Sequence, residues 1–137
     1  MANRLVTLKT RADFLRVAAG RRRAARPGLV LQAEPCPPGA GAGEKVRVGF
    51  TASRKVGNAV VRNRAKRRLR AAAAEILQRR GRSDTDYVLI ARAGTGERQY
   101  AELVDDLTGA LRQVERQLAR GGASSLPRRD EEGRDEG

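Results

Sequence analysis

The sequence contains no histidine, no tryptophan and a single cysteine. Without histidine, the chain lacks the side chain that most often serves as a general acid or base near neutral pH. It also lacks the His and Cys sets that hold structural or catalytic zinc. The lone Cys36 excludes an internal disulfide, which is typical of a reducing compartment. These absences argue against an active site of the common acid–base, zinc or disulfide kinds.

Aromatic residues and long apolar runs are scarce as well. Phe, Tyr and Trp make up 3% of the 137 residues, so the core must be built mainly from aliphatic side chains. No run of 18 apolar residues is present, so we expect no membrane span. The first residues lack the apolar stretch of a secretory signal peptide. We therefore expect a cytoplasmic protein of one ordinary-sized domain, without a membrane partner.

Positive charge is what the chain has in excess. It carries 29 Lys and Arg against 16 Asp and Glu, which gives a net charge of +13. The excess is uneven, because residues 1–82 hold 21 basic and 4 acidic residues, a net charge of +17, whereas residues 83–137 hold 8 and 12, a net charge of −4. Such a composition predicts a polyanionic partner, nucleic acid before an anionic membrane surface. The partner should contact the first two thirds of the chain.

Hydrophobic periodicity predicts three helices, at residues 10–20, 58–80 and 103–118, and three strands, at residues 29–33, 46–53 and 87–92. Thr10 and Asn58 are the expected N-caps of the first two helices. The Pro- and Gly-rich segment 34–45 is expected to be a flexible hairpin loop between the first two strands. The order predicts one α+β domain over residues 1–119. Residues 120–137 have no apolar pattern and are expected to be a disordered tail.

Two aspartate pairs and the cysteine are the remaining candidates for chemistry. Asp84 and Asp86 flank a turn before a strand, where turn and cap hydrogen bonds explain them best and a metal pair is the alternative. Asp105 and Asp106 lie on a helix rich in Arg and are expected to be i, i+4 charge partners. Cys36 has no neighbouring base, so we do not expect it to be a nucleophile. We expect no catalytic residue and no metal ligand in the protein.

The second helix concentrates positive charge on almost every face. Ten Lys and Arg residues separate Glu44 from Glu75, the next acid along the chain. A narrow apolar seam covers about 80° of the helix at 100° per residue, and it consists of Val61, Ala65, Leu69, Ala72 and Ile76. Solvated helix faces normally mix both signs, because like charges at i, i+4 destabilise a helix. A row of phosphates would turn this repulsion into attraction, so the helix predicts a nucleic-acid contact, of either RNA or DNA.

The stretch VGFTASRKVGNAVVRNRAKRRLR, from Val48 to Arg70, resembles the signature of the bacterial ribonuclease P protein component. The hallmark of that family is an RNR tripeptide, here residues 62–64, followed by a basic helix. ADFLRVAAGRR and DYVLIAR also occur in the family's order, so the resemblance covers about residues 4–118. It implies a ferredoxin-like two-layer sandwich of order αβββαβα, with the basic helix in a left-handed βαβ crossover. It also implies a fourth strand, which we expect near residues 22–26.

The resemblance further implies a function. Members of the family bind the catalytic RNA of ribonuclease P and assist it in removing the 5′ leader of precursor tRNA. The chain would then be a subunit of an endoribonuclease whose catalysis resides in the RNA. The expected partners are that RNA and precursor tRNA, with Mg²⁺ held mainly by the RNA and no association between copies of the protein.

The resemblance also implies two sets of site residues. The RNA-facing set is Arg54, Lys55, Asn58, Arg62, Asn63, Arg64, Lys66, Arg67, Arg68 and Arg70. A cleft for the single-stranded leader, between the first helix and the sheet, is expected to contain Phe14, Leu29, Leu31 and Tyr87, with Lys66 and Arg70 along its rim. Relatives often carry aromatic side chains where this chain has Ala18 and Leu31. We therefore expect a cleft that stacks fewer bases.

Two other functions stay open at this point. A ribosomal-type protein of the same small α/β fold would bind ribosomal RNA and sediment with ribosomal subunits. A non-specific DNA-binding module would bind duplex DNA and structured RNA with equal affinity.

Overall fold

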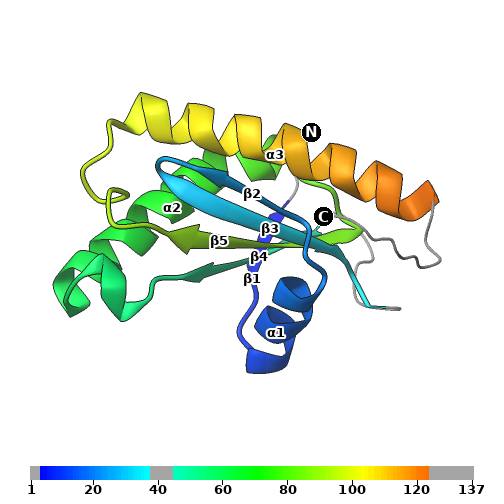
Figure 1. Ribbon diagram of the computed structural model, residues 1–137, viewed down its shortest axis with the longest axis horizontal. Helices are drawn as coiled ribbons and strands as arrows, with labels where there is room; N and C mark the ends of the chain where they lie inside the picture. Colours follow the sequence, from blue (N-terminus) through cyan, green and yellow to red (C-terminus); the bar gives the residue numbers. More distant parts are fainter. Residues whose placement is uncertain (1–3, 38–44, 124–137) are drawn as a thin grey trace.

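A five-stranded mixed sheet forms the centre of the protein, which a computed structural model describes over residues 4–37 and 45–123 (Figure 1). The elements are β1 (Arg4–Thr7), α1 (Arg11–Ala19), β2 (Arg23–Arg26), β3 (Leu29–Pro35), β4 (Lys45–Thr51), the 3₁₀ turn η1 (Arg54–Val56), α2 (Ala59–Arg80), β5 (Thr85–Ala91) and α3 (Tyr100–Ala123). The strand order is β1-β4-β5-β3-β2. Helices α2 and α3 pack on one face of the sheet, and α1 lies on the other.

The predicted α+β sandwich is confirmed, with one added strand. The order αβββαβα is present from α1 onward, and the strand implied near residues 22–26 is β2. The addition is β1, which pairs in parallel with β4 through registers such as Leu5 opposite Val46. A strand of four residues is too short to show a recognisable period. Helix α3 continues to Ala123, beyond the boundary expected at residue 119, and the rest of the expected tail lies outside the described residues.

Strands β3 and β4 do not pair with each other as a hairpin, contrary to the prediction, and residues 38–44 of the predicted loop lie outside the described residues. Strand β5 is inserted between these strands, antiparallel to β3 and parallel to β4. The composition of a loop shows that the chain turns, but it does not show which other strand fills the space between its two ends. Strand β5 is buried at almost every residue, as its continuous apolar sequence predicts for a central strand.

Local chemistry explains where α1 and α2 begin. Thr10 Oγ1 accepts a hydrogen bond from the backbone N–H of Asp13 at 3.2 Å, and Asn58 Oδ1 accepts one from Val61 at 3.0 Å, so both predicted N-caps are confirmed. Gly57, directly before the second cap, has φ of 150°, and a Cβ there would lie 2.8 Å from Val61 Cγ1. Since only glycine adopts this backbone conformation readily, it allows the sharp turn from η1 into α2.

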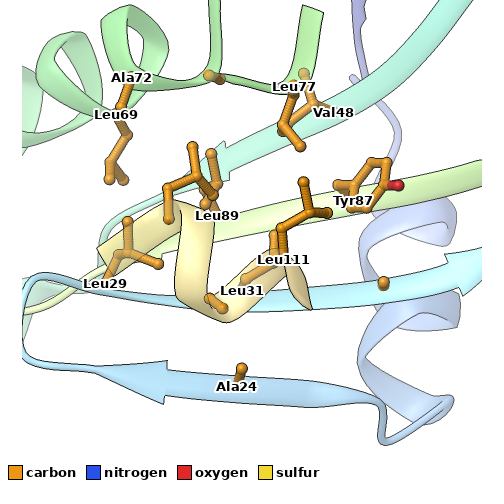
Figure 2. Packing of buried hydrophobic residues seen from close by; sticks show 14 of the residues in the cluster. Ala24, Leu29, Leu31, Val48, Leu69, Ala72, Leu77, Tyr87, Leu89 and Leu111 are labelled. Carbon is orange, nitrogen blue, oxygen red and sulfur yellow. The ribbon is translucent and has the colours of Figure 1, made fainter. Parts of the chain in front are cut away.

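Two apolar clusters hold the helices on the sheet. The larger lies between the sheet and α2 and α3 (Figure 2), and its largest buried members are Leu29, Leu31, Leu69, Leu77, Tyr87, Leu89, Leu103, Leu107 and Leu111. The smaller lies under α1 and consists of Leu8, Val17 and Val88, with Phe14 and Ile90 partly buried. Successive residues of β5 therefore face different clusters, as the alternation of side chains along a strand requires.

Candidate nucleic-acid interface

The exposed side of α2 and the preceding turn η1 form a basic surface without carboxylate partners. Seven of its residues make no ion pair with any acid within residues 4–37 and 45–123, namely Arg54, Lys55, Arg62, Arg64, Lys66, Arg67 and Arg70. We call these seven the α2 basic surface. Asn58 and Asn63 of the predicted set are exposed beside them, although the side chain of Asn58 is used as the N-cap.

The surroundings of these seven residues leave their charge available to an external anion. The first turn of α2 holds no acid, so the positive end of the helix dipole adds to the repulsion among the cations. Arg62 Nε is buried without a hydrogen-bond partner. Glu75, the one acid of α2, accepts a hydrogen bond from Tyr100 Oη at 3.0 Å and lies beyond the last of the seven. Folding alone therefore gains little from this arrangement of charge.

Arg68 differs from its neighbours on α2. Its Nη1 donates to the carbonyl oxygen of Thr95 at 2.8 Å, and its Nη2 donates to that of Arg98 at 2.5 Å. These two hydrogen bonds connect α2 with the loop between β5 and α3. The structure thus directs the Arg68 guanidinium toward the protein's own backbone, where it positions α2 and this loop relative to each other.

A cleft of about 540 Å³ lies between α1 and the sheet. It is lined by Lys9, Arg11, Phe14, Leu15, Ala18, Gln32, Phe50, Thr51, Val88 and Ile90. The Phe14 ring is placed against Gly49, where an added Cβ would lie 2.6 Å from Phe14 Cζ, so the missing side chain makes room for the ring. Arg70 lies over the Phe50 ring, 5.5 Å from its centroid. This contact joins the cleft to the α2 basic surface, whereas Lys66 is not among the lining residues.

Leu29, Leu31 and Tyr87 do not line this cleft, so this part of the prediction is wrong. All three are fully buried on the opposite face of the sheet, in the cluster beneath α2 and α3. Because a shift of one residue moves a side chain to the other face, the neighbouring residues take their place, and these are Gln32, Val88 and Ile90. On β3 the more apolar face, with Leu29, Leu31 and Ala33, packs beneath α2 and α3, whereas Gln32 is on the face that meets α1.

Asp86 belongs to a buried ion cluster and not to a turn or cap, which corrects its predicted role. Its carboxylate is fully buried, contacts the Arg16 guanidinium of α1, and lies 3.3 Å from Arg47 Nε of β4. It also accepts a hydrogen bond from the Cys36 thiol at 2.9 Å. Burial, together with this bond, raises the pKa of Cys36 to about 12, so the thiol stays protonated and is a poor nucleophile.

Asp84 and Asp106 also bind arginines, whereas exposed Asp105 forms none of the ion pairs among the described residues. Asp84 accepts hydrogen bonds from the Arg82 guanidinium, which lower the pKa of its carboxyl group. Asp106 is buried and accepts from Arg98 Nε at 2.6 Å and from the backbone N–H of Gly28 at 3.0 Å, so it is not an i, i+4 partner as predicted.

The described residues contain neither a candidate metal cluster nor a helix able to span a membrane. Residues 4–37 and 45–123 contain no group of three or more His, Cys, Asp or Glu that could hold a metal ion, and the buried carboxylates already bind guanidinium groups. A Mg²⁺ site made by the protein therefore has no suitable set of ligands in this part of the chain. In the same part, no helix combines the length and apolar character needed to cross a membrane.

Comparisons with known proteins agree with this geometry. The profile of the family described as Ribonuclease P matches residues 2–115. The ribonuclease P protein component of Paramagnetospirillum magneticum is 54% identical over 114 residues, which cover 83% of this chain and 86% of the relative. That of Gluconacetobacter diazotrophicus is 48% identical over 114 residues, which cover 83% and 95%. A solved structure of the Staphylococcus aureus RNase P protein matches with a TM-score of 0.60 at 25% identity, covering 77% of this chain and 92% of that one.

Proposed function

The chain belongs to the ribonuclease P protein family, and from this premise we propose that it binds the catalytic RNA of ribonuclease P through the α2 basic surface. In the same proposal the cleft under α1 holds the 5′ leader of precursor tRNA, and the assembly removes this leader to give the mature 5′ end. In this proposal the RNA catalyses the cleavage that removes the leader. We infer a cytoplasmic location from this substrate. The relatives named above are all ribonuclease P proteins by name, so neither alternative function gains support from them.

The observation that carries the proposal is the set of seven cations on η1 and α2 that have no carboxylate partner in the part of the chain that the structure describes. Each phosphate that a cation neutralises releases condensed counterions, which favours binding and makes it salt-dependent. Most of the seven are arginines, whose planar guanidinium can hold a phosphate through two hydrogen bonds. Arg68 acts in this proposal as a positioning residue, because its guanidinium already binds two carbonyl groups.

The cleft suits an unpaired RNA strand. Lys9 and Arg11 supply positive charge for phosphates, while Phe14 and Phe50 are its only aromatic lining residues within the described chain. Base–aromatic stacking contributes about 1–3 kcal/mol per base. Aliphatic contacts with Val88 and Ile90 would supply much of the remaining attraction, with little preference for sequence.

The protein assists by electrostatics and positioning. Two RNA molecules repel each other, and a basic protein between them screens that repulsion and steers the substrate. Such screening lowers the concentration of Mg²⁺ that the RNA needs. The Mg²⁺ itself supplies the metal-ion chemistry of the cleavage and would be held mainly by RNA oxygens.

Reconstitution tests this function. Purified protein mixed with the catalytic RNA at low Mg²⁺ should accelerate cleavage of precursor tRNA well above the rate of the RNA alone. The matched control is the double variant Arg62→Ala/Arg64→Ala, which should lose most of that gain. No acceleration by the unchanged protein would reject the proposal.

A second experiment tests the cleft. Phe14→Ala should weaken binding of precursor tRNA more than binding of mature tRNA, because only the precursor carries a leader. Val17→Ala, on the same helix but fully buried, is the control for a change in the packing of α1. Equal losses for precursor and mature tRNA with Phe14→Ala would assign Phe14 to the core alone.

A further inference from the structure

Five arginines gather at the sheet edge opposite β1, where α3 crosses β2. They come from three separate segments and are Arg23, Arg26, Arg92, Arg112 and Arg116. Arg92 Nη1 donates to the carbonyl oxygen of Arg26 at 2.8 Å, and Arg26 Nη2 donates to Gln113 Oε1 at 3.2 Å. Gln117 Nε2 donates to the carbonyl oxygen of Arg23 at 2.9 Å. Arg112 and Arg116 directly precede these two glutamines, so we call the five residues the β2–α3 arginine surface.

This surface shares two properties with the α2 basic surface. Within residues 4–37 and 45–123, none of its arginines forms an ion pair with a carboxylate. Glu34 pairs with Arg22 and Asp106 with Arg98, whereas Glu115, which lies between Arg112 and Arg116 in the sequence, forms no ion pair within the same residues. The buried side-chain atoms without a hydrogen-bond partner, among the described residues, are Arg62 Nε, Arg26 Nε and Gln117 Oε1. The two donors are comparable, since Arg62 Nε belongs to the α2 basic surface and Arg26 Nε lies where β2 meets α3; Gln117 Oε1 is an acceptor and gives no support for binding a phosphate.

Protection of an exposed sheet edge explains only part of this cluster. Charged side chains on an edge strand such as β2 discourage pairing with other chains. That accounts for Arg23 and Arg26. It does not account for Arg92 after β5, or for Arg112 and Arg116 on the exposed side of α3.

The two basic surfaces lie over opposite halves of the sheet. Helix α2 packs on β1, β4 and β5, whereas α3 packs on β3 and β2 (Figure 1). The edge strands β1 and β2 are separated by four strand spacings, which at about 4.8 Å each amount to about 19 Å. The two surfaces thus lie over different strands of the sheet, each on its own helix.

We propose that the β2–α3 arginine surface binds the phosphate backbone of a second, double-helical RNA segment while the α2 basic surface is occupied. The proposal rests on the proposed function, because both segments belong to the complex of catalytic RNA and substrate. The surface consists of arginines without an aromatic residue, so it fits phosphates and not unpaired bases. In this proposal the surface binds RNA independently of nucleotide sequence, and the protein connects two RNA segments of the assembly.

The test is the double variant Arg112→Gln/Arg116→Gln in the reconstituted complex, with RNA affinity measured over a series of salt concentrations. The slope of log K against log salt should decrease in magnitude by about 0.7–0.9 for each arginine removed, while the melting temperature stays unchanged. Asp105→Asn, another exposed substitution on α3, is the matched control and should not reduce the slope. An equal reduction with Asp105→Asn would attribute the effect to α3 itself and overturn the proposal.

A parallel measurement separates this proposal from the proposed function. If α2 binds RNA, Arg62→Ala/Arg64→Ala should reduce the salt slope whether or not the β2–α3 arginine surface also binds RNA. A reduced slope for that variant, together with an unchanged slope for Arg112→Gln/Arg116→Gln, overturns the second surface alone. Unchanged slopes for both variants overturn the proposed function itself. If the Arg112→Gln/Arg116→Gln loss appears only after precursor tRNA is added, the second segment is the substrate; if it appears with the catalytic RNA alone, the segment belongs to that RNA.

Discussion

The arginines of the α2 basic surface and those around Asp86 have the same side chain in opposite surroundings. Arg16 and Arg47 have side chains that are 28% and 15% exposed, and both meet a fully buried carboxylate that ties α1 and β4 to β5. Arg62 and Arg64 have no acid within reach in the described chain. The arginines paired with Asp86 thus stabilise the fold, whereas those of the α2 basic surface are available to bind an external anion. Substitutions in the two regions should therefore change different quantities.

Removing the carboxylate of Asp86 should produce the largest effect on the fold. Asp86→Ala removes the buried carboxylate and leaves Asp13 as the remaining acidic partner of the Arg16 and Arg47 guanidinium groups. We therefore expect the free energy of unfolding to fall by about 3 kcal/mol. Urea denaturation measures it. Asp84→Ala is the matched control, because its side chain is 64% exposed and a surface pair contributes less than about 1 kcal/mol. Similar losses for both variants would contradict the larger contribution that we assign to the buried ion pairs of Asp86.

Removing cations from the α2 basic surface should change binding and leave folding intact. For Arg62→Ala/Arg64→Ala we expect the slope of log K against log salt to lose about 0.7–0.9 per residue. The free energy of unfolding should change by less than about 0.5 kcal/mol or rise slightly, because like charges are removed. Binding titrations and urea denaturation on the same preparation check both. An unfolding loss comparable with that of Asp86→Ala would show that these arginines also serve the fold.

Arg67 and Arg68 sharpen the comparison within a single helix. Arg68→Ala removes two hydrogen bonds to backbone carbonyls, so we expect a loss of about 1–3 kcal/mol in the free energy of unfolding and an unchanged salt slope. Arg67→Ala should reduce the slope by nearly one unit without altering stability. The reverse pattern would make Arg68 an RNA contact, as its place in the motif predicts.

Alkylation of the Cys36 thiol, which donates a hydrogen bond to Asp86, tests the ion cluster around Asp86 without a substitution. Since its pKa is raised to about 12, the rate of alkylation by iodoacetamide should rise about tenfold per pH unit from pH 8 to 11. The neutral thiol contributes stability that is fully present below pH 9 and is lost as the pH rises toward 12. A plateau in the rate near pH 9 would contradict the bond between Cys36 and Asp86.

Local sequence features predicted the elements of the fold well. The caps at Thr10 and Asn58 and the helical seams depend on contacts a few residues apart, so the sequence shows them directly. The prediction of a hairpin between β3 and β4 was wrong because the strand between them, β5, comes much later in the chain. Pairing over such distances is decided by the packing of whole elements.

The candidate site was predicted only in part for the same reason. The α2 cations follow each other in sequence, so their clustering is visible there. The role of Asp86 depends on Arg16 and Arg47, which lie far away in the chain. In the cleft, Gln32 lies where Leu31 was predicted, and this difference of one position decides which face of the sheet a side chain occupies. Arg68 did carry a signal, because it lies next to the apolar seam on the helical wheel.

The salt dependence of binding between the unchanged protein and the catalytic RNA tests the central claim most directly. If the seven cations without partners each meet a phosphate, log K should fall with log salt with a slope of about −5 or steeper. A slope shallower than about −2 would mean that this surface binds few phosphates. It would contradict the assignment of the unpaired arginines and lysines of η1 and α2 to RNA.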